Sequence, residues 1–286
     1  MTFTTRFAPS PTGPLHLGHA YSAMLAYDMA MAKGGRFLLR IEDIDQSRAR
    51  PAWEAQIYED LSWLGLSWPQ PVMRQSDRLP RYRAALEQLT AMGLTYPCSC
   101  NRADIEAAAG APQEGVPQFG PDGRIYPGTC RGRGPDETTG QDVLRLNMEK
   151  AARTAELRSF TETGADFAGT YTLDPEQLIS TVGDIILVRR NMGSSYHLSV
   201  VTDDADQKIT HAVRAADLRE ATQIHVLLQS LLGLPTPIYH HHHLIRDDTG
   251  KRLAKRDDAR AIAKYRAEGT SPQDIREMLG LPLLSG

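Results

Sequence analysis

Residues 6–19, RFAPSPTGPLHLGH, decide how the amino-terminal part of this chain folds. Residues 2–8, which overlap the start of this stretch, alternate loosely between apolar and polar side chains, and this pattern predicts a short strand. The segment from Pro9 to Pro14 is rich in proline and can continue neither strand nor helix, so it forms a loop. From about Gly18, apolar residues recur mostly at helical spacing until Gly34, where glycine ends the predicted helix.

Strand and helix signals continue to alternate beyond this stretch. Residues 36–41 (RFLLRI) predict a buried strand, Pro51 suits the first turn of a helix, and another helix is expected from about residue 79 to 92. Strand, helix, strand and helix in this order predict an α/β fold with a parallel sheet. Further along, we expect strands at 184–189 and 196–202, a helix at 221–232, and a short helix after the capping sequence at 271–274.

The composition is that of an ordinary globular protein. The 286 residues are 41% hydrophobic and 23% charged, and the net charge of −3 excludes a polybasic protein. No apolar run approaches the ~18 residues that would span a membrane, and the first residues lack the apolar core of a secretory signal. The three cysteines argue against a disulfide framework, so a cytoplasmic protein is expected.

The loop and helix start within residues 6–19 suit an anionic phosphate. A helix start offers unpaired N–H groups and the positive end of the helix dipole. His16 and His19 would lie on one side of the first turn and could donate to phosphate oxygens, while Gly18 leaves room for a ligand. On the residues alone, a capping histidine beside a surface histidine is an alternative interpretation. The stretch has neither the glycines nor the lysine of a P-loop.

The sequence His16-Leu-Gly-His19 resembles the HIGH signature of the class I aminoacyl-tRNA synthetases, and RFAPSPTGPLHLGH is similar to the glutamyl branch in particular. The resemblance implies a Rossmann-like parallel sheet with an insertion. It also implies that His16, Gly18 and His19 bind ATP, and that both histidines are catalytic. Their role would be to stabilise negative charge on the α-phosphate as an aminoacyl-adenylate forms.

Class I enzymes carry a second, lysine-rich motif, and residues 252–256 (RLAKR) are similar to it. Lys255 matches the catalytic lysine and would bind ATP, neutralising the triphosphate as pyrophosphate leaves. Arg252 and Ala254 depart from the usual lysine and serine, which puts the rate or the mobility of the loop in doubt.

Glutamate carries two carboxylates and an ammonium group, so its pocket needs cations and an anion in fixed places. Arg6 follows the first strand, and Glu42 ends the second at the edge where α/β sheets bind ligands. The resemblance implies that Glu42 meets the substrate ammonium and that the glutamate pocket is lined by Arg6, Ala8, Ser10, Glu42, Tyr196 and Arg214.

Cys98, Cys100 and Cys130 supply three thiolates, one fewer than a tetrahedral zinc site needs. On chemistry alone, the candidates for the fourth ligand are Asp104, Glu106, Glu114 and Asp122. By resemblance to the zinc site of short glutamyl-synthetase paralogues, Tyr126 takes that place and the zinc is structural.

The run from His240 to His243 is expected on a strand, where neighbouring side chains point to opposite faces, so these histidines should not converge on one metal ion. His241 matches a family position and is expected near the adenosine.

The resemblance suggests four regions: a first catalytic half (1–97), a zinc-binding insertion (98–140), the rest of the insertion with the second catalytic half (141–245), and the lysine loop with a short helical segment (246–286).

Few residues follow residue 256, so the chain resembles the short paralogues that lack an anticodon-binding domain. Such paralogues activate L-glutamate with Mg-ATP and transfer it to the queuosine base of tRNA(Asp). The alternatives are a compact enzyme that charges the 3′ end of tRNA(Glu), and an inactive tRNA-binding paralogue. We expect a monomer with no membrane partner.

Overall fold

A parallel sheet forms where the first strands of the sequence were expected. The computed structural model describes residues 1–108, 117–156, 158–245 and 260–282. Strand β2 pairs in parallel with β1 on one side and with β3 on the other. The bounds are β1 Thr4–Phe7, β2 Arg36–Ile41 and β3 Met73–Arg74.

A second sheet continues from the free edge of β1. Its strand order is β11-β12-β8-β9, with parallel pairs β11–β12 and β12–β8 and an antiparallel hairpin β8–β9. The Thr210 amide, just before β11, donates to the Thr4 carbonyl at 3.0 Å and joins the two sheets. The bounds are β8 Ser159–Glu162, β9 Gly169–Thr172, β11 His211–Ala215 and β12 Ile238–His242. The predicted parallel α/β fold is therefore confirmed.

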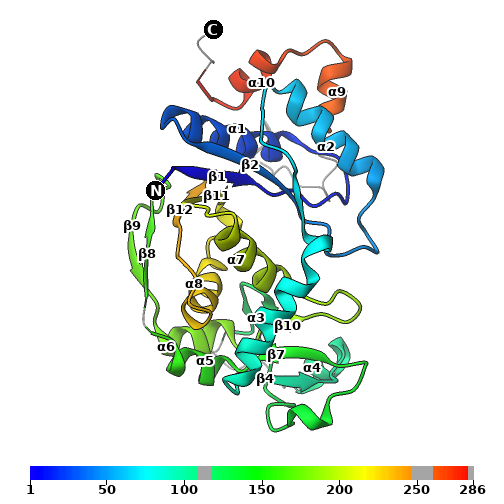
Figure 1. The fold of residues 1–286 in the computed structure, drawn as a ribbon, viewed down its shortest axis with the longest axis vertical. Coiled ribbons are helices and arrows are strands. Elements are labelled where there is room, and N and C mark those ends of the chain that lie inside the picture. The colour runs from blue at the N-terminus through cyan, green and yellow to red at the C-terminus, as the bar shows by residue number, and fades with distance from the viewer. Residues whose placement is uncertain (109–116, 157, 246–259, 283–286) are drawn as a thin grey trace.

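Helices cover both faces of the strands β1, β2, β11 and β12. In Figure 1, α1, α2, α9 and α10 lie on one side of these strands, and α7 and α8 lie on the other. Two hydrophobic cores match this arrangement, since one joins α1 and α2 to β1 and β2 and the other surrounds α8. The bounds are α1 Leu17–Ala32, α2 Pro51–Trp63, α3 Leu79–Ala91, α7 Tyr196–Asp206, α8 Thr222–Leu231, α9 Ile262–Ala267 and α10 Pro272–Met278.

The part of the chain that holds the cysteines lies at the opposite end of the molecule from α9 and α10 (Figure 1). It packs on an antiparallel sheet with strand order β10-β7-β4 and includes a small hairpin, β5–β6. The remaining bounds are β4 Thr95–Cys98, α4 Arg102–Ala108, β5 Phe119–Gly120, β6 Gly123–Arg124, β7 Val143–Leu146, α5 Met148–Thr154, α6 Pro175–Gln177, the π-helical turn Leu178–Val182, β10 Ile186–Val188, and the 3-10 turns Gln75–Arg78, Pro135–Glu137 and Ala216–Leu218.

The strand predicted at residues 196–202 is wrong, because this segment begins helix α7. Val200, Val201 and Thr202 are β-branched and favour a strand locally. The helix is buried on nearly every side from His197 to Asp204, so no polar face marks the helical period in the sequence. Ser195 caps its amino end by accepting the Leu198 amide.

The other helix predictions hold. Helix α8 covers most of residues 221–232, and α10 begins with the capping box predicted at Ser271 and Asp274. None of the helices that the structure describes is both long and apolar enough to cross a membrane.

Candidate active site

One cavity of about 570 Å³ opens at the carboxyl ends of β1, β2 and β11. This is the edge at which ligands bind in open α/β sheets. Its walls include every predicted ATP and glutamate residue that the structure describes: Arg6, Ala8, Ser10, His16, Gly18, His19, Glu42, Tyr196 and Arg214. The structure thus brings these residues together, and their chemical roles stay predictions. Lys255, Arg252 and Ala254 lie outside the described residues.

The two histidines of the HLGH stretch form an imidazole pair at the start of α1. His16 is the N-cap, and its Nδ1 accepts the Gly18 amide at 3.2 Å, while the Nδ1 of His19 accepts the His16 amide at 3.2 Å. A neutral imidazole whose Nδ1 accepts a hydrogen bond carries its proton on Nε2. The rings stack with centroids 3.8 Å apart. Two imidazoles of the same tautomer therefore share one wall of the cavity as hydrogen-bond donors.

The absence of a side chain at Gly18 also leaves space for the His16 ring. A Cβ atom at this position would lie 3.1 Å from the Cε1 atom of the His16 ring. A larger residue would push the capping imidazole away from the helix start.

The predicted lysine loop lies within residues 246–259, and the residues just before and just after this segment in the sequence both contact the site. Ile245, just before it, lines the cavity. After it, Ala261 forms an antiparallel bridge with His16, and the Ile262 amide donates to the Leu15 carbonyl at 2.9 Å. The chain on both sides of residues 246–259 is therefore anchored beside the histidine pair.

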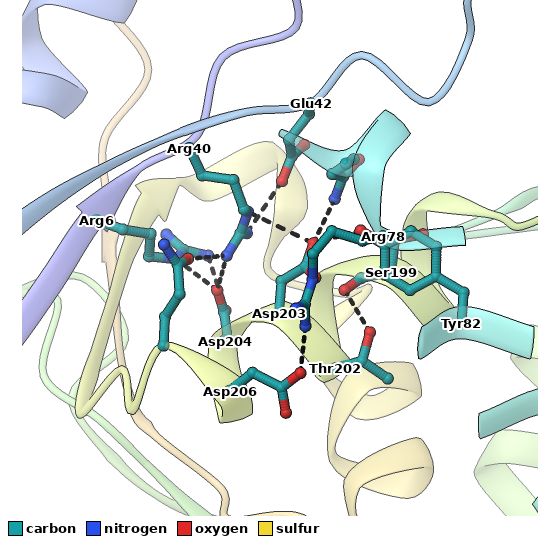
Figure 2. Close-up of polar contacts among 12 residues, drawn as sticks. Arg6, Arg40, Glu42, Arg78, Tyr82, Ser199, Thr202, Asp203, Asp204 and Asp206 are labelled. Atoms are coloured by element: carbon teal, nitrogen blue, oxygen red, sulfur yellow. Dashed lines mark hydrogen bonds and ion pairs between the residues drawn. The ribbon is translucent and has the colours of Figure 1, made fainter. Parts of the chain in front are cut away.

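Arg6 is held by a carboxylate that the sequence analysis did not identify. Its Nε and Nη2 donate to the two oxygens of Asp204, at 3.0 and 3.1 Å (Figure 2). Its Nη1 donates to the Val213 carbonyl at 3.1 Å. These bonds use three of the five guanidinium N–H groups, and the described residues leave the other two for a ligand. Arg6 is therefore held in one orientation and presents two N–H donors to a ligand, rather than all five.

A second buried arginine links this pair to Glu42. Arg40 donates to Asp204 at 2.7 Å and to Glu42 at 3.0 Å (Figure 2). Burial raises the pKa of Asp204, but the charges of Arg6 and Arg40 outweigh it and lower that pKa to about 2. At Glu42, burial outweighs Arg40 and raises the pKa. A substrate ammonium beside Glu42 would supply the charge that favours its ionised form.

Arg214 is held at the cavity wall by neutral partners. Its Nε donates to His241 Nε2 at 3.1 Å, its Nη1 to His225 Nδ1 at 2.9 Å, and its Nη2 to Thr222 at 2.7 Å. His241 in turn contacts Glu162 through Nδ1, and its amide donates to the same carboxylate at 2.9 Å. Burial raises the pKa of Glu162, but its hydrogen bonds with His241 and Gly164 lower it to about 2.

The histidines of the run from His240 to His243 lie in different surroundings. His240 to His242 lie on β12 as predicted, but His242 lines the cavity, where its Nε2 lies 2.7 Å from the Ser22 hydroxyl. His241 lies behind Arg214 instead. Because side chains alternate along a strand, neighbouring histidines of β12 face different surroundings, and the place of His241 near the adenosine stays a prediction.

The three cysteines form a compact cluster at the other end of the molecule. Their Sγ atoms all lie within 4.8 Å of one another, and Cys100 and Cys130 are 3.5 Å apart. The Tyr126 hydroxyl lies 3.3 Å from the sulfurs of Cys98 and Cys100. Tetrahedral zinc with bonds of about 2.3 Å to sulfur and 2.0 Å to oxygen requires ligand separations of about 3.5–3.8 Å. The donor set fits a metal ion of this kind.

The pKa values differ among the members of the cluster, and burial raises the pKa of the Cys100 thiol to about 11. Burial raises the pKa of the Cys130 thiol, but hydrogen bonds with Tyr126 and Cys100 outweigh it and lower the pKa to about 6. Burial raises the pKa of the Tyr126 hydroxyl, so this group needs a bound cation to ionise at neutral pH.

The carboxylates considered as fourth ligand are engaged elsewhere. Asp104 accepts the Asn101 amide, Glu106 pairs with Arg102, and Asp122 accepts from His197. Glu114 lies outside the described residues.

Sequence reasoning missed the residues that support the binding groups. Arg40 carried a signal, because it is a charged residue within the apolar strand RFLLRI and such a residue is buried only when it is paired. Asp204 lies in an acidic run after a β-branched stretch. Nothing in the sequence ties this run to Arg6, because that contact joins residues 198 positions apart.

Comparison with known proteins agrees with this geometry. The model of the tRNA synthetases class I (E and Q) catalytic domain matches residues 2–284. The Glutamyl-Q tRNA(Asp) synthetase of Rhodobacter capsulatus is 63% identical over 280 residues, which cover 97% of this chain and 99% of that protein. The protein of the same name from Symbiobacterium thermophilum is 41% identical over 94% of this chain and 83% of its own length.

Among solved structures, the glutamate tRNA ligase of Elizabethkingia meningosepticum, in complex with its amino acid, superposes with a TM-score of 0.72 at 26% identity. The match covers 96% of this chain and 59% of that larger one. The chain belongs to the class I tRNA synthetases (E and Q) and, within them, to the glutamyl-Q tRNA(Asp) synthetases.

Proposed function

We propose that this chain activates L-glutamate with Mg-ATP and transfers the glutamyl group to the queuosine base of tRNA(Asp). The observation that carries the proposal is the single cavity that combines a stacked imidazole pair with two arginines and Glu42. A relative named for this activity is 63% identical along nearly its whole length, which supports the same conclusion.

In the first step, an α-carboxylate oxygen of glutamate attacks the α-phosphorus and pyrophosphate leaves. His16 and His19 donate through Nε2 to the phosphate oxygens on which charge develops. Lys255, which lies between Ile245 and Ala261 in the sequence, accompanies the departing pyrophosphate. The side-chain carboxylate of the substrate takes the remaining donors of Arg6 and Arg214, and its ammonium meets Glu42.

In the second step, a hydroxyl of the queuosine ring attacks the carbonyl carbon of the adenylate, and AMP leaves. The chain needs no nucleophile of its own, so its residues contribute through positioning and electrostatics. Zinc on the three cysteines and Tyr126 would have a structural role, since four protein ligands leave no open position on the metal.

A transfer assay with labelled glutamate tests the proposal. We expect label on queuosine-containing tRNA(Asp) and none on the same tRNA without queuosine or on tRNA(Glu). Nuclease digestion should release the label with the anticodon-loop nucleotide. Label on the 3′-terminal adenosine would instead identify a compact glutamyl-tRNA synthetase, and the absence of both transfer and glutamate-dependent ATP–pyrophosphate exchange would identify an inactive paralogue.

A further inference from the structure

Arg214 is the end of a buried chain of hydrogen bonds that reaches the cysteine-bearing region. Its Nη1 lies 2.9 Å from His225 Nδ1, His225 Nε2 lies 3.1 Å from His197 Nδ1, and His197 Nε2 lies 3.2 Å from Asp122 Oδ1. The four residues come from β11, α8, α7 and the turn of the β5–β6 hairpin. The chain of contacts therefore joins the wall of the cavity to a hairpin outside it.

Arg214 at one end can only donate and the Asp122 carboxylate at the other can only accept, so the direction of each hydrogen bond in the chain is fixed. A guanidinium can only donate, so His225 accepts at Nδ1 and carries its proton on Nε2. That proton is donated to His197, whose own proton then lies on Nε2 and is donated to the Asp122 carboxylate. His225 is neutral in this arrangement. Burial and the charge of Arg214 lower the pKa of His225 far below its ordinary value, which agrees with a neutral ring.

Asp122 is suited to be the anchor of this chain. Burial raises the pKa of Asp122, but its hydrogen bond and charge interaction with His197, together with the charge of Arg189, outweigh burial and lower it, so Asp122 stays ionised at neutral pH. His197 and His225 are 5% and 2% exposed, so water cannot easily replace the bond between them. On its other side, Arg214 is oriented by His241. Loss of the His225 arm would leave the guanidinium held only by His241 and Thr222.

We propose that Asp122 and His197 are positioning residues for glutamate, because they orient Arg214 through His225 and so make the amino-acid pocket depend on the β5–β6 hairpin. The inference rests on the proposed function, in which Arg214 binds the substrate carboxylate. It goes beyond that function because Asp122 and His197 do not line the cavity.

Calorimetric titration of the full-length protein with glutamate and, separately, with ATP tests the inference. Asp122→Ala should raise the Kd for glutamate about tenfold, the loss expected for one hydrogen bond in a charged chain, and leave the Kd for ATP unchanged. Asp122→Asn keeps an oxygen acceptor for His197 and should stay within about threefold of wild type. Glu106→Gln, on α4 of the same region and paired with Arg102 at the surface, is the matched control and should change neither Kd.

A double-mutant cycle separates positioning from general damage. His197→Leu fills the space without hydrogen bonding, so it should weaken glutamate binding, and Asp122→Ala should then have no further effect. Independent effects that add in the double variant, or a Kd for glutamate that Asp122→Ala leaves unchanged, would contradict the inference alone. Wild-type protein that binds ATP but not glutamate would contradict the proposed function and the inference together.

Discussion

Asp204 should be the carboxylate on which the stability of the glutamate side of the cavity depends most. Its two oxygens accept three hydrogen bonds from Arg6 and Arg40, and its side chain is 8% exposed. Asp204→Asn keeps the shape of the side chain but leaves two buried guanidinium groups short of a counter-charge. Removing one partner of a buried ion pair typically costs about 3–5 kcal/mol.

The lowered pKa of Asp204 gives a second value for the free energy that its ion pairs contribute to folding. A pKa lowered from 3.8 to about 2 corresponds to about 2 kcal/mol of stabilisation of the charged form. Because the pKa is lower in the folded state, this stabilisation is fully present above pH 3.8 and is lost as the pH falls through about 2. We therefore expect the variant to lose about 3 kcal/mol of unfolding free energy at pH 7, or roughly 6–12 °C in Tm.

Urea and thermal unfolding of wild type, Asp204→Asn and Asp206→Asn at pH 7 provide the assay. Asp206 lies on the same helix but pairs with Arg78 and Arg81 at the surface, so its variant should lose less than about 1 kcal/mol. The gap between the Asp204 variant and wild type should also narrow below pH 4. Equal losses for the two variants would refute the reasoning that the buried pair, rather than charge on this helix in general, holds Arg6.

Three further changes test other parts of the account. Lys255→Ala should abolish glutamate-dependent ATP–pyrophosphate exchange without changing the circular dichroism spectrum, and full activity would show that the lysine motif is misassigned. Elemental analysis should find about one zinc per chain, lost in Cys98→Ser or Cys130→Ser, whereas metal-free and fully active protein would exclude the zinc site. Burial raises the pKa of Asp60 to about 6, with Arg266 lowering it only in part, so the contribution of Asp60 to wild-type stability should fall as the pH rises from about 4 to 6. A pKa raised from 3.8 to about 6 corresponds to about 3 kcal/mol at pH 7, and loss of the ion pair with Arg266 offsets part of this gain. Asp60→Asn should therefore gain about 2 kcal/mol at pH 7 and nothing below pH 4, as urea unfolding at both pH values would show.

The sequence was informative wherever a function or a backbone conformation depends on neighbouring residues. The HLGH stretch predicted both a helix start and a phosphate site, and the structure places His16 as the cap of α1 on the cavity wall. The same local logic failed at residues 196–202, where burial on all sides hides the helical period. The β-branched residues then make the sequence look like a strand, although tertiary packing makes the segment a helix.

The supporting network could not be read from the sequence, because each of its bonds joins distant segments. Asp204 meets Arg6 across 198 positions, and Asp122 meets His197 across 75. On residue chemistry alone, Asp122 was a candidate metal ligand, and only the fold shows that it accepts a hydrogen bond from a buried histidine instead. Sequence predicts which groups a site needs, whereas the fold determines what orients them.

The most direct test is a crystal structure of the chain with a non-hydrolysable glutamyl-adenylate analogue. The account predicts that the phosphate-like group lies within hydrogen-bonding distance of Nε2 of His16 and His19. The analogue's ammonium group should meet Glu42, and its side-chain carboxylate should contact Arg6 and Arg214. An analogue bound outside this cavity, or with its carboxylate turned away from both arginines, would contradict the assignment of the site.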